Sequence, residues 1–187
     1  TAAWSGNPFH ASNNINSIDG DPTASGDGYD VHTLNIAAIT AIQEDLVEHY
    51  VDTLGDLPNV IWEVAIETDG TYARAGHDCD EWQDYIIAHI HTYEAGKTYQ
   101  HPVLYSVQWP GGDNAEIIAS AAECFAPNVE MLGPGTSVML VDTDHIDWQS
   151  EDEQWPWRAL TQGAGAFFMM DGGYSTADDQ DGTATYA

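Results

Sequence analysis

The chain has 187 residues, and 43% of them are hydrophobic, which is enough for a core and argues against wholesale disorder. Thirty-one acidic residues face only three Lys and Arg residues, so the formal net charge is −28. This charge repels nucleic acid and anionic lipid, and no apolar run is long enough for a membrane-spanning helix. The composition therefore excludes nucleic-acid and membrane partners.

The excess of acid is interpreted as adaptation to concentrated salt. The acidic residues are spread among apolar, periodic segments rather than gathered in one tail. Like charges at this density destabilise a compact chain in dilute buffer, and the Debye length falls from about 10 Å at 0.1 M to about 3 Å at 1 M salt. We therefore expect the fold to depend on molar salt.

The first expected element is a short strand at residues 8–10, which a polar, glycine-rich loop follows over residues 18–30. A helix is predicted next, from Thr33 to Leu54, because its apolar residues recur with helical spacing. The stripe that we expect this helix to bury consists of Ile39, Ile42, Leu46 and Tyr50.

A buried strand is predicted over residues 59–67, which are apolar and rich in β-branched side chains. The following helix is expected to begin at Asp80, with Gln83 completing a capping box, and to end at Gly96. Its predicted apolar stripe consists of Trp82, Tyr85, Ile86, His89, Ile90 and Tyr93. On this stripe His89 is interpreted as a core histidine.

The remaining expected elements continue the alternation of strands and helices. They are a strand at 103–109, a helix at 113–123, a short extended piece at 128–132, a strand at 137–142, a helix at 152–161 and a strand at 166–171. Alternation of this kind predicts parallel βα units in an α/β fold. We expect one domain over residues 1–174 and an acidic, flexible tail over 175–187.

Neither the cysteines nor the acidic loop forms a specific pattern. Cys79 and Cys124 stand alone in the sequence, so a disulfide and two free buried thiols both remain open. The loop from Asp19 to Asp30 has the composition of a calcium site, but its spacing does not match an EF-hand, and we interpret it as a solvated loop. No metal or cofactor is expected.

Candidate functional residues follow the expected strands, because reactive groups of parallel barrels project from the carboxyl ends of the strands. They are His10, Asn13, Asn14, Glu67, Gln108, Trp109, Asp142, Asp144 and His145, with Trp148 a further aromatic that could stack on a sugar. Carboxylates at two separate strand ends are typical of glycoside hydrolysis. Alternatively, Glu67 is one more solvated acid and residues 142–145 are a loop with Asx turns.

Several motifs together resemble one enzyme family. They are Asn7-Pro-Phe-His10, Asn13-Asn14, Ile18-Asp-Gly-Asp21, His32-Thr-Leu34, Leu57-Pro-Asn-Val-Ile-Trp-Glu63, Gln100-His-Pro102, Gln108-Trp-Pro-Gly-Gly112 and Asp142-Thr-Asp-His145. Over roughly Trp4 to Tyr174, the chain resembles the second part of cellulase-like glycoside hydrolases, which are TIM-barrel enzymes of the large retaining clan. The resemblance implies a partial (β/α)8 barrel, about strands three to eight.

The resemblance also implies residue roles. Residues 8–10, 59–67, 103–109, 137–142 and 166–171 resemble strands three, four, five, seven and eight. The clan places its acid/base after strand four and its nucleophile after strand seven, which implies Glu67 as acid/base and Asp144 or Asp142 as nucleophile. The implied substrate-binding residues are His10, Asn13, Asn14, Gln108, Trp109, His145 and Trp148.

The chain departs from the family in two ways. Ile66 stands where the clan has an asparagine that contacts the 2-hydroxyl of the sugar, and strands one and two have no counterpart. A barrel typically needs ~250 residues, and a shorter one leaves open edges, so we expect self-association, most simply as a twofold dimer. The alternative function is an inactive truncated barrel that at most binds carbohydrate. A polysaccharide substrate slightly favours an extracellular location, although the sequence does not open with a secretory signal.

Overall fold

The structure is a computed structural model, and it describes residues 2–65, 79–107, 121–127, 138–141, 160–161 and 166–167. Its helices are α1 (Ala2–Ser5), the 3-10 helix η1 (Tyr29–His32), α2 (Ala37–Leu54) and α3 (Cys79–Glu94). Its strands are β1 (Trp62–Glu63), β2 (Val103–Val107), β3 (Cys124–Pro127), β4 (Val138–Val141) and β5 (Ala166–Phe167).

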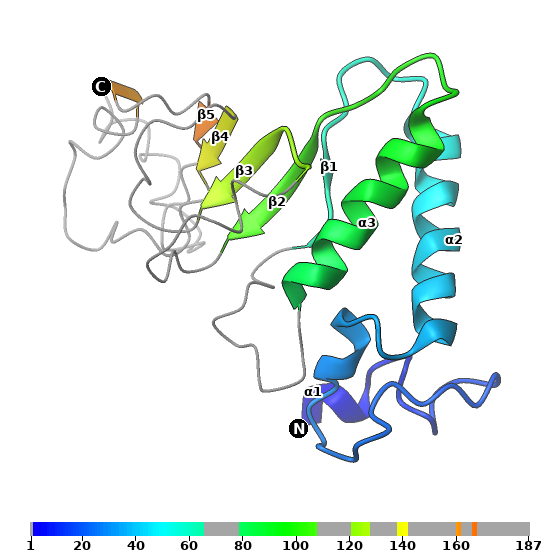
Figure 1. Ribbon diagram of the computed structural model, residues 1–187. Coiled ribbons are helices and arrows are strands. Elements are labelled where there is room, and N and C mark those ends of the chain that lie inside the picture. Colours follow the sequence, from blue (N-terminus) through cyan, green and yellow to red (C-terminus); the bar gives the residue numbers. More distant parts are fainter. Residues whose placement is uncertain are drawn as a thin grey trace, which may run out of the picture.

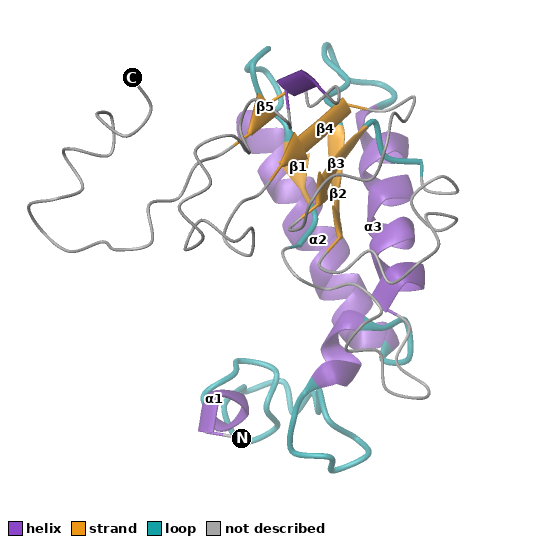
Figure 2. Cartoon of the chain, turned by 90° about the vertical axis from the view of Figure 1, so that its left-hand side faces the viewer, coloured by secondary structure: helices purple, strands orange, loops and turns teal. Residues whose placement is uncertain are grey.

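The strands form one parallel sheet in which spatial order follows chain order, β1-β2-β3-β4-β5. Trp62 of β1 lies opposite Val103 of β2, and Leu104 of β2 lies opposite Cys124 of β3. Helices α2 and α3 both cover the same face of the sheet (Figures 1 and 2). The predicted α/β class with parallel βα units is therefore confirmed.

The main core lies between α3 and the first three strands. The apolar spacing in α3 turns one side of the helix toward the sheet, where Ile87 and Val103 have no exposed surface. The buried members of this core are Trp82, Ile86, Ile87, Ile90, Val103, Tyr105, Ala122 and Phe125. The hydroxyl of Tyr105 donates a hydrogen bond to Asp80 Oδ1 at 2.8 Å, which ties the start of α3 to the middle of β2.

Polar pairs join α2 to α3 at intervals of one helical turn. The pairs are Glu44–Tyr85, Glu48–His89 and Asp52–Tyr93, which recur every four residues on both helices. Because the residue numbers rise together, the two helices run parallel, as successive helices of βα units do. These three pairs form the seam between α2 and α3. Within the seam, His89 lies 3.3 Å from Glu48 and is only half-buried, so its interpretation as a core histidine is wrong.

The N-terminal segment differs from the sequence prediction. Residues 8–10 form turns rather than a strand, because the side chain of Asn7 accepts a hydrogen bond from the backbone N–H of Phe9 at 2.9 Å. Helix α2 begins at Ala37 rather than at Thr33, whose hydroxyl bonds the carbonyl of Asp30 and the N–H of Asn35. Such local side-chain bonds compete with regular structure.

Part of the predicted stripe of α2 also lies on the surface. Ile39 is buried as expected, but Leu46 and Tyr50 are 51% and 52% exposed. Leu54 continues the same line with 37% of its surface exposed. The face of α2 that carries these three residues is therefore partly open to solvent.

Strand β3 lies where the sequence predicted no strand, between β2 and β4. Residues 121–123 before it are not helical, so the predicted helix at 113–123 does not reach Glu123. The rest of that helix, the extended piece at 128–132, most of the helix at 152–161 and the tail at 175–187 lie outside the described residues. Cys79 and Cys124 are both free and buried, so the second of the two alternatives holds.

Within the described part of the chain, no helix is long and apolar enough to cross a membrane.

Candidate functional site

The candidate site is the edge of the sheet at which the strands end. Strand β1 ends at Glu63, four residues before Glu67, and β4 ends at Val141, immediately before Asp142. Because the strands are parallel, both ends lie at the same edge. Two strands separate β1 from β4, so their ends would lie about 14 Å apart in a flat sheet. A retaining pair needs about 5–5.5 Å, which requires the sheet to curve and the side chains to turn inward.

Most of the sequence-predicted site residues lie outside the described residues. They are Glu67, Gln108, Trp109, Asp142, Asp144, His145 and Trp148. Their roles in catalysis and sugar binding stay predictions. The structure places the other three, His10, Asn13 and Asn14, together in the N-terminal segment.

Asn13 and Asn14 hold the N-terminal segment in shape. The amide nitrogen of Asn14 lies within hydrogen-bond distance of three carbonyl oxygens, the nearest being that of Ile18 at 2.9 Å, and its oxygen accepts the N–H of Ile18 at 2.9 Å. The amide of Asn13 donates to the carbonyl of Ser5 at 2.7 Å and to that of Asn7 at 2.9 Å. These bonds give both side chains a structural role, and sugar binding by them stays a prediction.

His10 presents a polar atom beyond its local contacts. Its Nδ1 accepts the backbone N–H of Ser12 at 3.3 Å and lies 2.8 Å from the hydroxyl of the same residue. A neutral imidazole that accepts at Nδ1 carries its hydrogen on Nε2. Figure 1 shows the N-terminal segment at the end of α2 and α3 toward which the arrow of β2 points. The N-terminal segment therefore lies on the side of the molecule toward which β2 runs.

The acidic loop folds around two of its carboxylates, whereas Asp19 and residues 22–25 are exposed, so its interpretation as a solvated loop holds only in part. Asp21 is only 8% exposed and accepts hydrogen bonds from the backbone N–H groups of Gly26 at 2.7 Å and Ser25 at 2.8 Å. Burial alone would raise the pKa of Asp21, but these two N–H groups together with the hydroxyls of Ser25 and Thr23 lower the pKa overall. Asp30 is 4% exposed and accepts the hydroxyl of Thr23 at 3.2 Å. In the described ranges, no three metal-binding side chains gather into a site.

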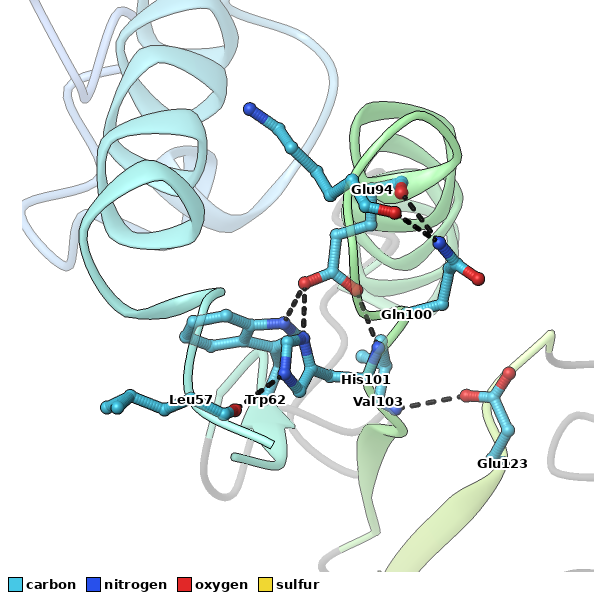
Figure 3. Close-up of polar contacts among 8 residues, drawn as sticks. Leu57, Trp62, Glu94, Gln100, His101, Val103 and Glu123 are labelled. Atoms are coloured by element: carbon cyan, nitrogen blue, oxygen red, sulfur yellow. Dashed lines mark hydrogen bonds and ion pairs between the residues drawn. The ribbon is translucent and has the colours of Figure 1, made fainter. Parts of the chain in front are cut away.

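The opposite edge of the sheet carries a buried polar cluster that sequence reasoning missed (Figure 3). Glu94, at the end of α3, accepts hydrogen bonds from the indole N–H of Trp62 at 2.8 Å and from the backbone N–H of His101 at 2.8 Å. Its Oε1 also lies 2.7 Å from Nδ1 of His101, whose Nε2 lies 2.9 Å from the carbonyl oxygen of Leu57. His101 lies in the Gln100-His-Pro102 motif, but no sequence signal pointed to Glu94, so the pair was not predicted.

The electrostatics of this cluster favour a charged pair. Burial would lower the pKa of His101, but its bonds to Glu94 and to the Leu57 carbonyl raise the pKa overall. Burial would raise the pKa of Glu94, but the N–H groups of His101 and Trp62 lower it overall. Trp62 begins β1, and His101 lies two residues before β2, so the cluster lies where the strands begin. This position is remote from the edge where barrel chemistry takes place.

Comparison of the chain with protein families, with curated proteins and with solved structures finds no match.

Proposed function

We propose that the chain is a salt-adapted glycoside hydrolase, a retaining β-glycosidase or cellulase-like enzyme, on a partial (β/α)8 barrel. The observation that supports this is the order of the sheet, in which five parallel strands follow one another, with the crossover helix α3 and the preceding helix α2 on the same face. In a closed barrel each strand is likewise added beside the preceding one. Strand β3 takes the place between strands five and seven that the family resemblance left empty.

In the proposed mechanism two carboxylates act from separate strand ends. Glu67, beyond β1, protonates the leaving oxygen and later deprotonates water, and Asp144 or Asp142, beyond β4, attacks the anomeric carbon. Aromatic side chains such as Trp109 and Trp148 stack on the sugar rings.

The test is hydrolysis of aryl β-glycosides in molar salt. Glu67→Gln is compared with the wild type and with Glu63→Gln, a matched change at an exposed acid of β1. We expect Glu67→Gln to lose turnover and Glu63→Gln to retain it, and Asp142→Asn against Asp144→Asn identifies the nucleophile. Equal rates for Glu67→Gln and the wild type would remove the catalytic proposal.

A second candidate is an inactive truncated barrel that binds carbohydrate. Ile66 in place of the clan's asparagine favours it, as does the wide spacing of β1 and β4 in the sheet. This candidate predicts binding of soluble β-glucans in affinity electrophoresis without turnover of any aryl glycoside. Turnover that depends on Glu67 would exclude it.

We also propose that a second copy of the chain covers an open flank of this fold. Strand β1 is an edge strand of the sheet, and α2, the helix that precedes it, carries the exposed line of Leu46, Tyr50 and Leu54. In a barrel, a further strand would pair with β1 and a further helix would pack beside α2. Association of two copies would shield both features from water.

A further inference from the structure

The protons of the Glu94–His101 cluster follow from its hydrogen bonds. One carboxylate oxygen of Glu94 faces the backbone N–H of His101, and the other faces the indole N–H of Trp62. Both groups can only donate. A hydrogen between Oε1 and Nδ1 of His101, which lie 2.7 Å apart, can reside on either atom, and the two fixed donors favour it on Nδ1, which leaves Glu94 ionised although its side chain is only 1% exposed.

The contacts of His101 favour its charged form. Its Nε2 lies 2.9 Å from the carbonyl oxygen of Leu57, which can only accept, so Nε2 carries a hydrogen. With the shared hydrogen on Nδ1, which lies 2.7 Å from Oε1 of Glu94, both ring nitrogens are protonated. The neutral pair would instead place a carboxylic acid against a bare Nδ1, and the N–H groups that face Glu94 together with the Leu57 carbonyl favour the ion pair over it.

We propose that His101 is a buried imidazolium and that its ion pair with Glu94 is a pH-sensitive latch. The latch connects four parts of the chain, because Glu94 ends α3, Trp62 begins β1, Leu57 follows α2, and His101 leads into β2 (Figure 3). Loss of one proton from His101 removes its bond to Glu94 and leaves a buried carboxylate without its counter-charge. The start of the parallel sheet is then no longer held to the ends of both helices.

Among the described residues, charged groups on the neighbouring elements are engaged with other partners. From the α2 side, Asp52 is paired with Lys97 at 2.5 Å on the surface. From the side of β3, Glu123 accepts the backbone N–H of Val103 at 3.0 Å and lies 3.6 Å from His91 of α3.

On the β1 side, Glu63 is exposed, and in the turn before β2 the ring of Tyr99 lies 6.1 Å from that of His101. These neighbours supply no cation to the cluster, so the charge that balances Glu94 inside the protein is the imidazolium of His101.

The direct test is NMR of the full chain with ¹⁵N-labelled histidine in molar KCl. At pH 6.5, the ordinary histidine pKa, we expect His101 to show two protonated ring nitrogens, whereas a free imidazole is half deprotonated there. Loss of these signals in His101→Gln assigns them. A bare ring nitrogen on His101 at that pH would overturn the proposal.

A second test measures urea unfolding against pH. The folded chain holds a proton that the unfolded chain has lost once the pH exceeds 6.5, so the unfolding equilibrium constant of the wild type should rise up to about tenfold per pH unit more steeply than that of His101→Gln. His89→Gln, at the half-buried pair with Glu48, is the matched control and should keep the steep dependence. Equal slopes for the wild type and His101→Gln would contradict the latch.

If His101→Gln does not fold, Glu94→Gln serves as the second variant. Its amide keeps the shape of the carboxylate but cannot hold an imidazolium, so His101 should show one bare ring nitrogen at the pH where the wild type shows none. Two protonated nitrogens in Glu94→Gln would show that Glu94 is not the counter-charge and would overturn the proposal.

Discussion

Nδ1 of His101 lies 2.7 Å from Oε1 of Glu94, and the two side chains are only 3% and 1% exposed. This pair is the most deeply buried contact between acid and base in the described residues, in a chain that has three Lys and Arg residues in all. Because the pair lies where the strands begin, it can stabilise the sheet without entering the edge where we propose that catalysis occurs.

The indole of Trp62 is expected to matter for stability through its N–H. Trp62→Phe removes the donor that lies 2.8 Å from Glu94, and a lost hydrogen bond to a buried charge costs about 1.5–3 kcal/mol of unfolding free energy. The measurement is urea unfolding in molar KCl. Tyr99→Phe is the control, because that ring is 40% exposed and should change stability by no more than ~0.5 kcal/mol. Similar losses in both variants would contradict the assigned role of the indole N–H.

Two glycines of the acidic loop form a matched pair for testing the packing of Trp4. Both have positive φ, +77° at Gly26 and +75° at Gly28, so alanine should cost about 1–2 kcal/mol at either position. A Cβ at Gly28 would also lie 2.2 Å from the ring of Trp4, whereas a Cβ at Gly26 would meet nothing within 4 Å. We therefore expect Gly28→Ala to lower the unfolding free energy more than Gly26→Ala and to change the fluorescence of Trp4. Equal effects would mean that Trp4 does not pack on the loop.

The net charge predicts a fold that depends on salt. Circular dichroism should show loss of helix as KCl falls well below about 1 M, because screening of the acidic residues weakens. Sucrose, which favours compact states without screening charge, serves as the control and should restore less structure than KCl. A chain that remains fully folded in millimolar salt would contradict the interpretation of its composition.

Self-association is predicted to depend on the exposed line of α2. Leu46→Gln with Tyr50→Gln should convert dimers into monomers in light scattering at molar salt, because both side chains are about half exposed in one copy. Asp45→Asn, an exposed change on the same helix, should leave the mass unchanged. A wild-type chain that is monomeric at all concentrations would remove the proposal.

The long periodic elements could be predicted from sequence, and the short ones could not. Helix α3 was expected to run from Asp80 to Gly96, close to the Cys79–Glu94 observed, because its apolar spacing repeats over four turns. Strand β3 was missed because its four residues, Cys124–Pro127, are too few for a pattern and follow an alanine-rich stretch that is typical of a helix. The strand expected at residues 8–10 fails because bonds from asparagine side chains fold that segment into turns.

The candidate site could likewise be predicted from sequence only in part. Reading strand ends from sequence placed Glu67 and Asp142 beyond two strands, and the structure shows that β1 and β4 are parallel members of one sheet. The Glu94–His101 pair could not be predicted, because a glutamate at a helix end and a histidine in a turn meet only when α3 packs beside β2. The capping box expected at Asp80 and Gln83 stays a prediction, and the structure adds that Gln83 is fully buried and that the Asp80 carboxylate receives the Tyr105 hydroxyl.

The seam between α2 and α3 shows how helices can be aligned where lysine is scarce. In two of its three polar pairs, a tyrosine hydroxyl is the donor. The hydrogen bonds to Glu44 and Asp52 raise the pKa of Tyr85 and Tyr93, which keeps both hydroxyls protonated. A phenol is uncharged, so dissolved ions weaken its hydrogen bond to a carboxylate less than they weaken an ion pair between lysine and a carboxylate. Replacing Glu–Lys pairs between helices by Glu–Tyr pairs should therefore help other helical proteins to keep their helix–helix contacts in concentrated salt.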